Sequence, residues 1–196
     1  MMHRLAIFAS GAGSNARKII EYFQDHPRIE VGAVVTNNPH AGVVRHAEEF
    51  GVPMLFIDKK SFYRNHTVPK MLLDRGIDWI ILAGFLWLIP TDLIEAFPDH
   101  ILNIHPALLP KYGGKGMYGM HVHQAVKDAG ESETGITIHF VNARYDEGRM
   151  FFQARCDVAE DDNPEEIARK VHALEYQYFA PMIEKAIREQ EFQPEG

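Results

Sequence analysis

The residues best suited to chemistry lie in the segment ILNIHPALLP, at positions 101–110. Its first residues suit the interior of a strand, whereas Asn103 and His105 are poor filler for a core. Because these two residues are two positions apart, a strand projects both side chains from the same face. Pro106 and Pro110 keep both from being absorbed into a longer strand. The segment therefore predicts an amide donor and a titratable imidazole side by side at a strand end.

A carboxylate is expected to join this pair from the loop after residues 135–141. The chain contains 11 histidines, and it is the pairing with Asn103 that distinguishes His105 from the others. Asp146 lies in the loop NARYDEG, and near His105 it would orient the ring, stabilise imidazolium and raise the pKa from its reference value of about 6.5. The alternative is a solvated aspartate in a surface turn.

An amide, an imidazole and a carboxylate without a serine or cysteine nucleophile indicate that the attacking group arrives on the substrate. The protein would supply an oxyanion donor, worth roughly 10² to 10³ in rate, and a general acid or base, worth roughly 10² to 10⁴. Acyl or one-carbon transfer fits this division. A metal site is less well supported, because His121 and His123 lack a further ligand at diagnostic spacing and are interpreted as polar surface.

A second candidate is the loop SGAGSN at residues 10–15, between the first apolar run and the first helical pattern. Gly11 and Gly13 let backbone N–H groups approach an anion, and Ser14 and Asn15 add side-chain donors at a helix N-terminus. The loop lacks both the third glycine of the dinucleotide fingerprint and a GK[ST] sequence. It therefore predicts a phosphate site without naming a nucleotide. The alternative is a tight turn with an ordinary helix cap.

The elements that must position these groups alternate between strands and helices. Strands are expected at residues 4–10, 31–36, 53–57 and 79–85, with helices at 15–23, 42–50, 62–73 and 93–97. Further strands are expected at 101–104, 135–141 and 150–158, with a helix at 122–129 and a long one from Asn163 and Pro164. This alternation predicts an α/β fold, an open, twisted, mainly parallel sheet with helices on both faces. Ligands bind such sheets beyond the carboxyl ends of the strands.

Composition limits the remaining possibilities. A chain of 196 residues with 46% hydrophobic residues favours one domain over residues 1–196, with a frayed tail at 191–196. The formal charge of -7 gives no general attraction to nucleic acid or to an anionic membrane. The single cysteine excludes an internal disulfide, and the longest apolar stretch, 79–90, is shorter than the ~20 residues of a membrane span. We expect a cytoplasmic protein with small-molecule partners.

Five segments over nearly the whole chain resemble the folate-dependent formyltransferases. They are IFASGAGSNARKII, ILAGFLWLIP, LNIHPALLPKYGG, GITIHFVNARYDEG and VHALEYQYF. NIHP with LLP marks this group, and the length of the chain is similar to that of the members that act on phosphoribosylglycinamide. The resemblance implies a Rossmann-like formyltransferase fold. It also implies formyl transfer from 10-formyltetrahydrofolate to the amine of 5'-phosphoribosylglycinamide in purine biosynthesis, without a catalytic metal.

The resemblance further implies roles for individual residues. The active histidine would be His105, the formyl-oxygen donor Asn103 and the assisting aspartate Asp146. The acceptor phosphate would contact Gly13, Ser14 and Asn15, and its ribose would contact Glu175. The folate would contact Asn103, Leu86, Trp87, Leu88, Ile89 and the 142–146 loop, with Arg64 facing its glutamate tail. Position 87 is often arginine in the family and is tryptophan here.

The sequence also leads to expectations about binding partners and leaves two alternative functions open. The resemblance implies two small-molecule substrates, a monomer or weak homodimer, and neither a nucleic-acid nor a membrane partner. Two other functions are compatible with the same residues. The chain could formylate another phosphorylated amine, such as an amino sugar nucleotide, or it could be a noncatalytic phosphate-binding module in which His105 only packs.

Overall fold

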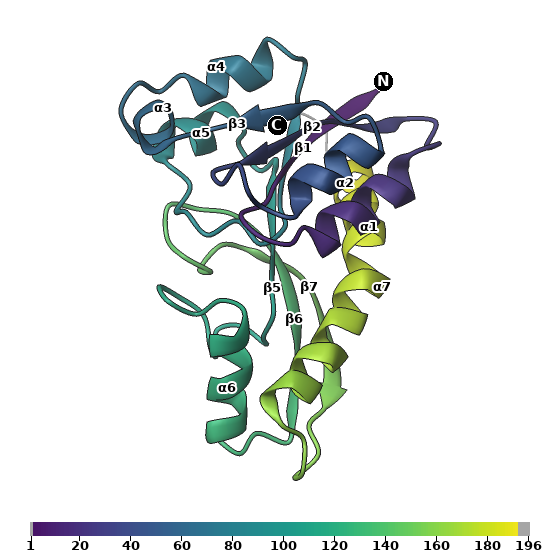
Figure 1. Cartoon of the computed structure of the whole chain (residues 1–196), viewed down its shortest axis with the longest axis vertical. Coiled ribbons are helices and arrows are strands. Elements are labelled where there is room, and N and C mark those ends of the chain that lie inside the picture. The colour runs from purple at the N-terminus through teal and green to yellow at the C-terminus, as the bar shows by residue number, and fades with distance from the viewer. Residues whose placement is uncertain (1, 192–196) are drawn as a thin grey trace.

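A seven-stranded sheet organises residues 2–191, the part of the chain that the computed structural model describes (Figure 1). Its strand order is β3-β2-β1-β4-β5-β6-β7. The strands are β1 (His3–Phe8), β2 (Ile29–Thr36), β3 (Met54–Phe56), β4 (Trp79–Leu82), β5 (Ile101–His105), β6 (Glu133–Phe140) and β7 (Met150–Asp157). The first five run parallel, and β6 and β7 are antiparallel to their neighbours. The expected open, mainly parallel sheet is confirmed.

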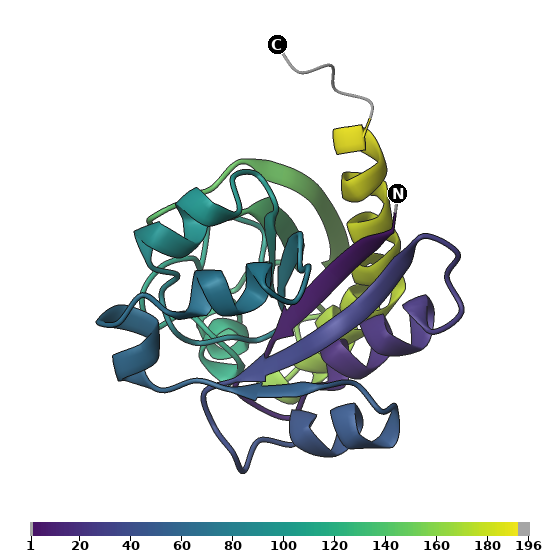
Figure 2. The ribbon, with the colours of Figure 1, turned by 90° about the horizontal axis from the view of Figure 1, so that it is seen from above.

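Helices cover both faces of the sheet, as expected. They are α1 (Ser14–Phe23), α2 (Val43–Glu49), α3 (Lys59–Tyr63), α4 (Val68–Leu73), α5 (Thr91–Ala96), α6 (Met120–Asp128) and α7 (Pro164–Glu191). Helices α1, α2 and α7 lie on one face of the sheet, and α3, α4 and α5 lie on the other (Figure 2). Buried residues of the first group share one hydrophobic core, and those of the second group share another. No helix within residues 2–191 combines the length and the apolarity needed to cross a membrane.

The helix expected over residues 62–73 is wrong, because α3 and α4 replace it. Pro69 cannot donate a hydrogen bond to the carbonyl of Asn65, and its ring would clash with that carbonyl in a continuous helix. His66 turns the chain between the two helices with a left-handed φ of 52°. The apolar pattern of 62–73 survives this break, since Phe62, Val68 and Leu72 are all buried.

The C-terminal helix α7 begins where the sequence predicts. The Asn163 side chain accepts a hydrogen bond from the backbone N–H of Glu166 at 2.9 Å, and the Glu166 carboxylate accepts one from the backbone N–H of Asn163 at 2.8 Å. This reciprocal pair is a capping box. Glu191, the first residue of the tail expected to fray, is instead the last residue of α7 and contacts the His3 ring at 3.0 Å. Residues 192–196 lie outside the described part of the chain.

The carboxyl ends of three central strands come together at one edge of the sheet. Phe8 of β1 pairs with Leu82 of β4, which in turn pairs with Asn103 of β5. The loops that follow are joined, since Ser10 N–H donates to the Gly84 carbonyl at 3.0 Å. The fold thus gathers the glycine loop, the loop after β4 and the end of β5 into one region.

Candidate active site

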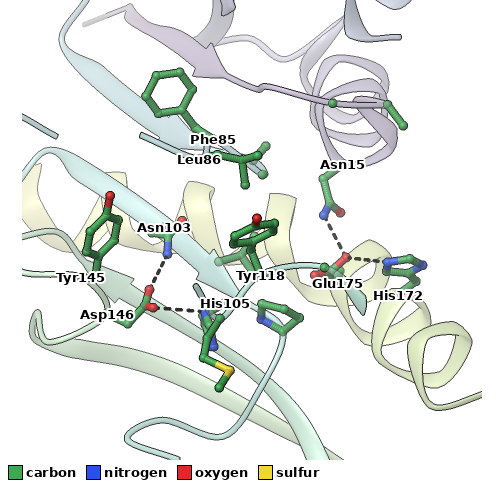
Figure 3. Close-up of a pocket in the computed structure, with 18 of the residues that line it drawn as sticks. Asn15, Phe85, Leu86, Asn103, His105, Tyr118, Tyr145, Asp146, His172 and Glu175 are labelled. Atoms are coloured by element: carbon green, nitrogen blue, oxygen red, sulfur yellow. Dashed lines mark hydrogen bonds and ion pairs between the residues drawn. The ribbon is translucent and has the colours of Figure 1, made fainter. Parts of the chain in front are cut away.

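Three polar side chains from two distant segments meet at the end of β5 (Figure 3). Asn103 and His105 belong to β5, and Asp146 belongs to the loop between β6 and β7. Asn103 Nδ2 donates to Asp146 Oδ1 at 3.4 Å, and Asp146 Oδ2 lies 3.5 Å from His105 Nδ1. All three residues line one cavity. The fold therefore joins the amide, the imidazole and the carboxylate that the sequence singles out.

Asp146 is held in place by its backbone and by the neighbouring glycine segment. Its φ is 55°, in the left-handed region that non-glycine residues seldom adopt. The Gly114 N–H donates to Oδ2 at 2.9 Å. Burial alone would raise the pKa of Asp146, but its contact with the His139 ring and the attraction of His105, together with the Gly114 N–H, outweigh burial and lower the pKa. The carboxylate is therefore ionised at neutral pH.

The His105 imidazole is a buried, neutral group. Its Nε2 lies 2.7 Å from the Tyr112 carbonyl oxygen, which only accepts, so Nε2 carries the proton. The residue is 3% exposed, and burial lowers the pKa of His105 despite the opposing effects of Asp146 and of the Tyr112 carbonyl. The expected rise of this pKa is wrong in sign, because desolvation exceeds the attraction of the carboxylate. Neutral His105 presents an unprotonated Nδ1 toward Asp146.

The cavity has a volume of about 690 Å³ and extends from the catalytic candidates toward α1 and α7. Its walls come from the glycine loop, the loop after β4, the end of β5, the 114–119 segment, α6, α7 and the loop that carries Asp146. Two carboxylates, those of Asp146 and Glu175, face the cavity. Among the described residues, Lys115 is the one lysine in the lining, and no arginine joins it. A polar ligand with several hydrogen-bonding groups fits such walls.

The glycine loop lies in this cavity, with Gly13, Ser14 and Asn15 in its lining. Gly13 has a φ of 78°, and a Cβ there would lie 2.5 Å from Val43 Cβ. Glycine is therefore required at position 13 for close packing against α2. No side chain caps the N-terminus of α1, so its backbone N–H groups are open to an anion.

Glu175 of α7 connects this loop with the opposite wall. Asn15 Nδ2 donates to Glu175 Oε2 at 2.9 Å, and His172 Nε2 lies 4.0 Å from the same oxygen. Burial raises the pKa of Glu175, and Asn15 and His172 oppose that rise. Asn15 Oδ1 is buried without a hydrogen-bond partner among the described residues. The group offers a carboxylate and an amide oxygen as acceptors to a ligand in the cavity.

The residues expected at the folate are divided between two cavities. Leu86 lines the large one, whereas Trp87, Leu88 and Ile89 line a smaller neighbour of about 60 Å³. Trp87 also packs within 6.1 Å, between ring centroids, of Phe62, Tyr63 and Phe85. Arg64 caps the C-terminus of α3 and lines neither cavity. The structure therefore does not bring Arg64 to the other predicted site residues.

Two histidines that line the large cavity, His123 and His172, were not predicted as site residues from the sequence. His123, interpreted as polar surface, is 1% exposed, and burial lowers its pKa to about 4. His121 is exposed and stacks on Tyr118. Helical spacing from Glu175 was a usable signal for His172, but nothing local indicated His123. Within residues 2–191, no group of three or more histidine, cysteine, aspartate or glutamate residues could hold a metal ion.

His139 is a further residue to which the sequence analysis gave no role. It is buried opposite Asn103 in the register of β5 and β6, and its Nε2 lies 3.0 Å from Asn103 Nδ2 and 3.6 Å from Asp146 Oδ1. Sequence spacing could not reveal this contact, since it depends on the pairing of two strands joined by a long connection. The polar cluster thus contains four side chains, with His139 behind the three that line the large cavity.

Comparison with known proteins places this geometry in a family. The formyl transferase family model matches residues 3–183. The chain is 44% identical over 186 residues to the chloroplastic phosphoribosylglycinamide formyltransferase of Arabidopsis thaliana, covering 92% of this chain and 64% of that protein. It is 30% identical over 191 residues to phosphoribosylglycinamide formyltransferase of Bacillus subtilis, covering 95% of each. The chain thus spans less than two thirds of the plant relatives and nearly all of the bacterial one.

A solved structure agrees with these matches. The crystal structure of phosphoribosylglycinamide formyltransferase from Bacillus halodurans has a TM-score of 0.86 and 32% identity, and the match covers 97% of this chain and all of that one. Fold, family model and sequence identity therefore lead to the same conclusion. The chain belongs to the formyl transferase family.

Proposed function

We propose that the chain transfers the formyl group of 10-formyltetrahydrofolate to the amine of 5'-phosphoribosylglycinamide, a step of purine biosynthesis. The observation that carries this proposal is the position of Asn103 and Asp146, which line both cavities. A donor in one cavity and an acceptor in the other would meet at these residues. The names of the relatives supply the acceptor and the transferred formyl group, and the folate donor follows from the sequence resemblance.

The acceptor fits the large cavity on chemical grounds. Its phosphate would accept hydrogen bonds from backbone N–H groups of Gly13, Ser14 and Asn15 at the start of α1. Its ribose hydroxyls would donate to the Glu175 carboxylate, which Asn15 already orients at 2.9 Å. The glycinamide amine would then extend toward His105. An amine next to a carbonyl titrates near 8, as a chain terminus does, so about a tenth or more of it is neutral at pH 7.

The donor fits the apolar side of the site. Leu86, Trp87, Leu88 and Ile89 would pack against the flat pterin ring, and backbone groups of the loop would satisfy its polar edges. The 142–146 loop would close the other side of this pocket. Arg64, at the end of α3, lines neither cavity, so it would contact the glutamate tail only where that tail extends beyond them.

The chemistry follows from three protonation states: an ionised Asp146, a neutral His105 and a neutral substrate amine. The amine attacks the formyl carbon, a C–N bond forms, and the carbonyl electron pair moves to oxygen. Asn103 N–H donates to that oxyanion. His105 Nδ1 takes a proton from the amine, and ionised Asp146 at 3.5 Å stabilises the imidazolium. The C–N bond to folate breaks as its nitrogen receives the proton from His105, so the enzyme returns to its starting state.

We also propose that the chain works as a single domain, as a monomer or weak homodimer, in the cytoplasm. The described residues share one continuous sheet, and one copy of the chain supplies every wall of both cavities. The single cysteine, Cys156, is half-buried and suits a reducing compartment. Sedimentation velocity at micromolar concentration checks the oligomeric state, and a stable higher oligomer would contradict the proposal.

The function is tested with the purified chain, 10-formyltetrahydrofolate and a panel of amines. Mass spectrometry of the product identifies the formylated amine. We expect formyl-phosphoribosylglycinamide, with far less product from the riboside that lacks the phosphate. Product from an amino sugar nucleotide alone, or no product from any amine, would contradict the proposed substrate.

A further inference from the structure

We infer that His139 is a positioning residue that fixes the reactive orientation of the Asn103 carboxamide. The inference rests on the proposed function, since it concerns the group that would donate to the oxyanion. His139 lies directly across from Asn103 in the antiparallel pairing of β6 with β5. Its side chain is 3% exposed, is absent from the lining of the large cavity and belongs to the wall of the smaller one, so its effect on the acceptor passes through its neighbours.

The contacts of the two ring nitrogens define the tautomer of His139. Nδ1 lies 3.0 Å from the carbonyl oxygen of Phe140, which only accepts, so Nδ1 carries a proton. In the neutral ring Nε2 is then an acceptor, and it lies 3.0 Å from Asn103 Nδ2. The structure thus aims the lone pair of His139 at the amide NH₂ of Asn103.

This acceptor decides which way the Asn103 amide faces. An amide turned by 180° would bring its oxygen against the Nε2 lone pair, and that arrangement is repulsive. One amide hydrogen is therefore committed to His139 at 3.0 Å, while the second faces Asp146 Oδ1 at the longer distance of 3.4 Å. The contact with Asp146 is the longer of the two, and it is the one that a developing oxyanion can replace.

The backbone around His139 holds its ring in this state. A Cβ at Gly148 would lie 1.7 Å from the Phe140 carbonyl oxygen and 3.3 Å from His139 Nδ1. Glycine at 148 thus lets the returning chain pack directly against the acceptor of the Nδ1 proton. The shift in register between Ile138 and His139 falls at the same place. The Nδ1 hydrogen bond is consequently enclosed, and the ring is not free to exchange tautomers without losing it.

Two substitutions separate the roles of the two nitrogens. In His139→Asn the amide nitrogen lies near the former Nδ1 and can still donate to Phe140, but the acceptor for Asn103 is lost. In His139→Gln the longer side chain can place its amide oxygen near the former Nε2, which restores an acceptor for Asn103. A merely structural role predicts equal or random effects, whereas a positioning role predicts rescue by glutamine.

The kinetic test compares kcat and KM of both variants for formyl transfer to phosphoribosylglycinamide. We expect His139→Asn to lower kcat by about tenfold or more with KM nearly unchanged, and His139→Gln to recover most of that loss. In an Asn103→Ala background, His139→Asn should cause no further loss, because the group it orients is gone. Equal kcat for the two variants, or an independent effect of His139→Asn in that background, overturns the inference.

A spectroscopic measurement tests the same inference apart from turnover. Nitrogen NMR of the wild-type protein with labelled histidines distinguishes a protonated from an unprotonated ring nitrogen, and His139→Gln assigns the signal. We expect protonated Nδ1 and unprotonated Nε2 at pH 7.5. Protonated Nε2 overturns the inference even if formyl transfer is observed. Failure of wild-type turnover with the expected tautomer would count against the proposed substrates and leave the orientation of Asn103 supported.

Discussion

His105 Nδ1 and Asp146 Oδ2 lie 3.5 Å apart although His105 ends β5 and Asp146 lies in the loop between β6 and β7. The Asp146 carboxylate raises the pKa of His105, whereas burial of the ring lowers it, and the effect of burial is the larger one. The pair therefore combines an ionised carboxylate with a neutral imidazole at neutral pH. A base in this state can accept a proton during the reaction and hold it beside a negative charge.

Removal of either β5 side chain should lower the rate of formyl transfer without unfolding the protein. We expect Asn103→Ala and His105→Ala each to reduce kcat by at least about 10²-fold, because one loses the oxyanion donor and the other the base. Steady-state kinetics and circular dichroism check both effects. Asn65→Ala and His40→Ala are matched controls at exposed positions outside both cavities. Near-native rates in Asn103→Ala and His105→Ala would remove these residues from the mechanism.

Asp146→Asn should change the pH dependence as well as the rate. Loss of the carboxylate removes a contribution that raises the pKa of His105, so that pKa falls further below its ordinary value. The acidic limb of the kcat/KM profile, which reports the free base, should therefore move to lower pH while the plateau falls. Asp25→Asn, at an exposed position, is the matched control. A shift of the limb to higher pH would contradict the assigned pair.

Gly13→Ala should weaken acceptor binding and stability together. The new Cβ would lie 2.5 Å from Val43 Cβ at a φ of 78°, so the loop must move. Gly51→Ala is a matched control, since it also has a left-handed φ, 67°, but no neighbour within 4 Å. We expect Gly13→Ala to cost about 1–3 kcal/mol more than the control in denaturant unfolding and to raise KM for the acceptor. Equal stabilities of the two variants would show that position 13 tolerates a side chain.

A further prediction concerns the phosphate group of the acceptor and its binding to the glycine loop. If backbone N–H groups at the start of α1 bind the phosphate, Ser14→Ala and Asn15→Ala should weaken binding of phosphoribosylglycinamide more than binding of its riboside. Isothermal titration calorimetry with both ligands measures the difference. An equal loss for the two ligands would argue against a phosphate site in this loop.

His123 should make the protein sensitive to mild acid. Its pKa is about 4 in the folded state, below the reference of about 6.5, so folding favours the neutral ring. The resulting stability is present above pH 6.5 and is lost as the pH falls from about 6.5 toward 4, by up to about 3 kcal/mol. His123→Gln should therefore lose less unfolding free energy than wild type between pH 7 and 4.5. Exposed His121→Gln is the control, and a wild-type-like loss in His123→Gln would contradict the buried neutral ring.

Most of the fold was predictable because strand and helix periods differ. The apolar runs that became β1, β2 and β4 have the continuous apolar character of strands buried on both faces. Pro69 indicates the break between α3 and α4. The apolar spacing of residues 62–73, however, is equally compatible with one continuous helix. Local pattern could not decide there between a continuous helix and two short ones.

The sequence predicted only those contacts of the site that follow from residue spacing along a single strand. Asn103 and His105 share a face by alternation alone, whereas the contact of His139 with Asn103 depends on the register of β6 against β5. The sign of the pKa shift of His105 depends on how deeply the ring is buried, which composition does not reveal. Asp146 was identified as a candidate, but neither its distance of 3.5 Å from His105 nor the left-handed turn at its own backbone can be read from the sequence.

The central claim is that Asn103, His105 and Asp146 act together on one reacting carbon. Single-turnover transfer of a ¹³C-labelled formyl group to phosphoribosylglycinamide, measured for the three single variants and for the combined variant, tests it most directly. Residues that act as a unit give non-additive losses, so the combined variant should be little slower than the slowest single variant. Losses that multiply across the three positions, or label that stays on the folate in the wild type, would contradict the account.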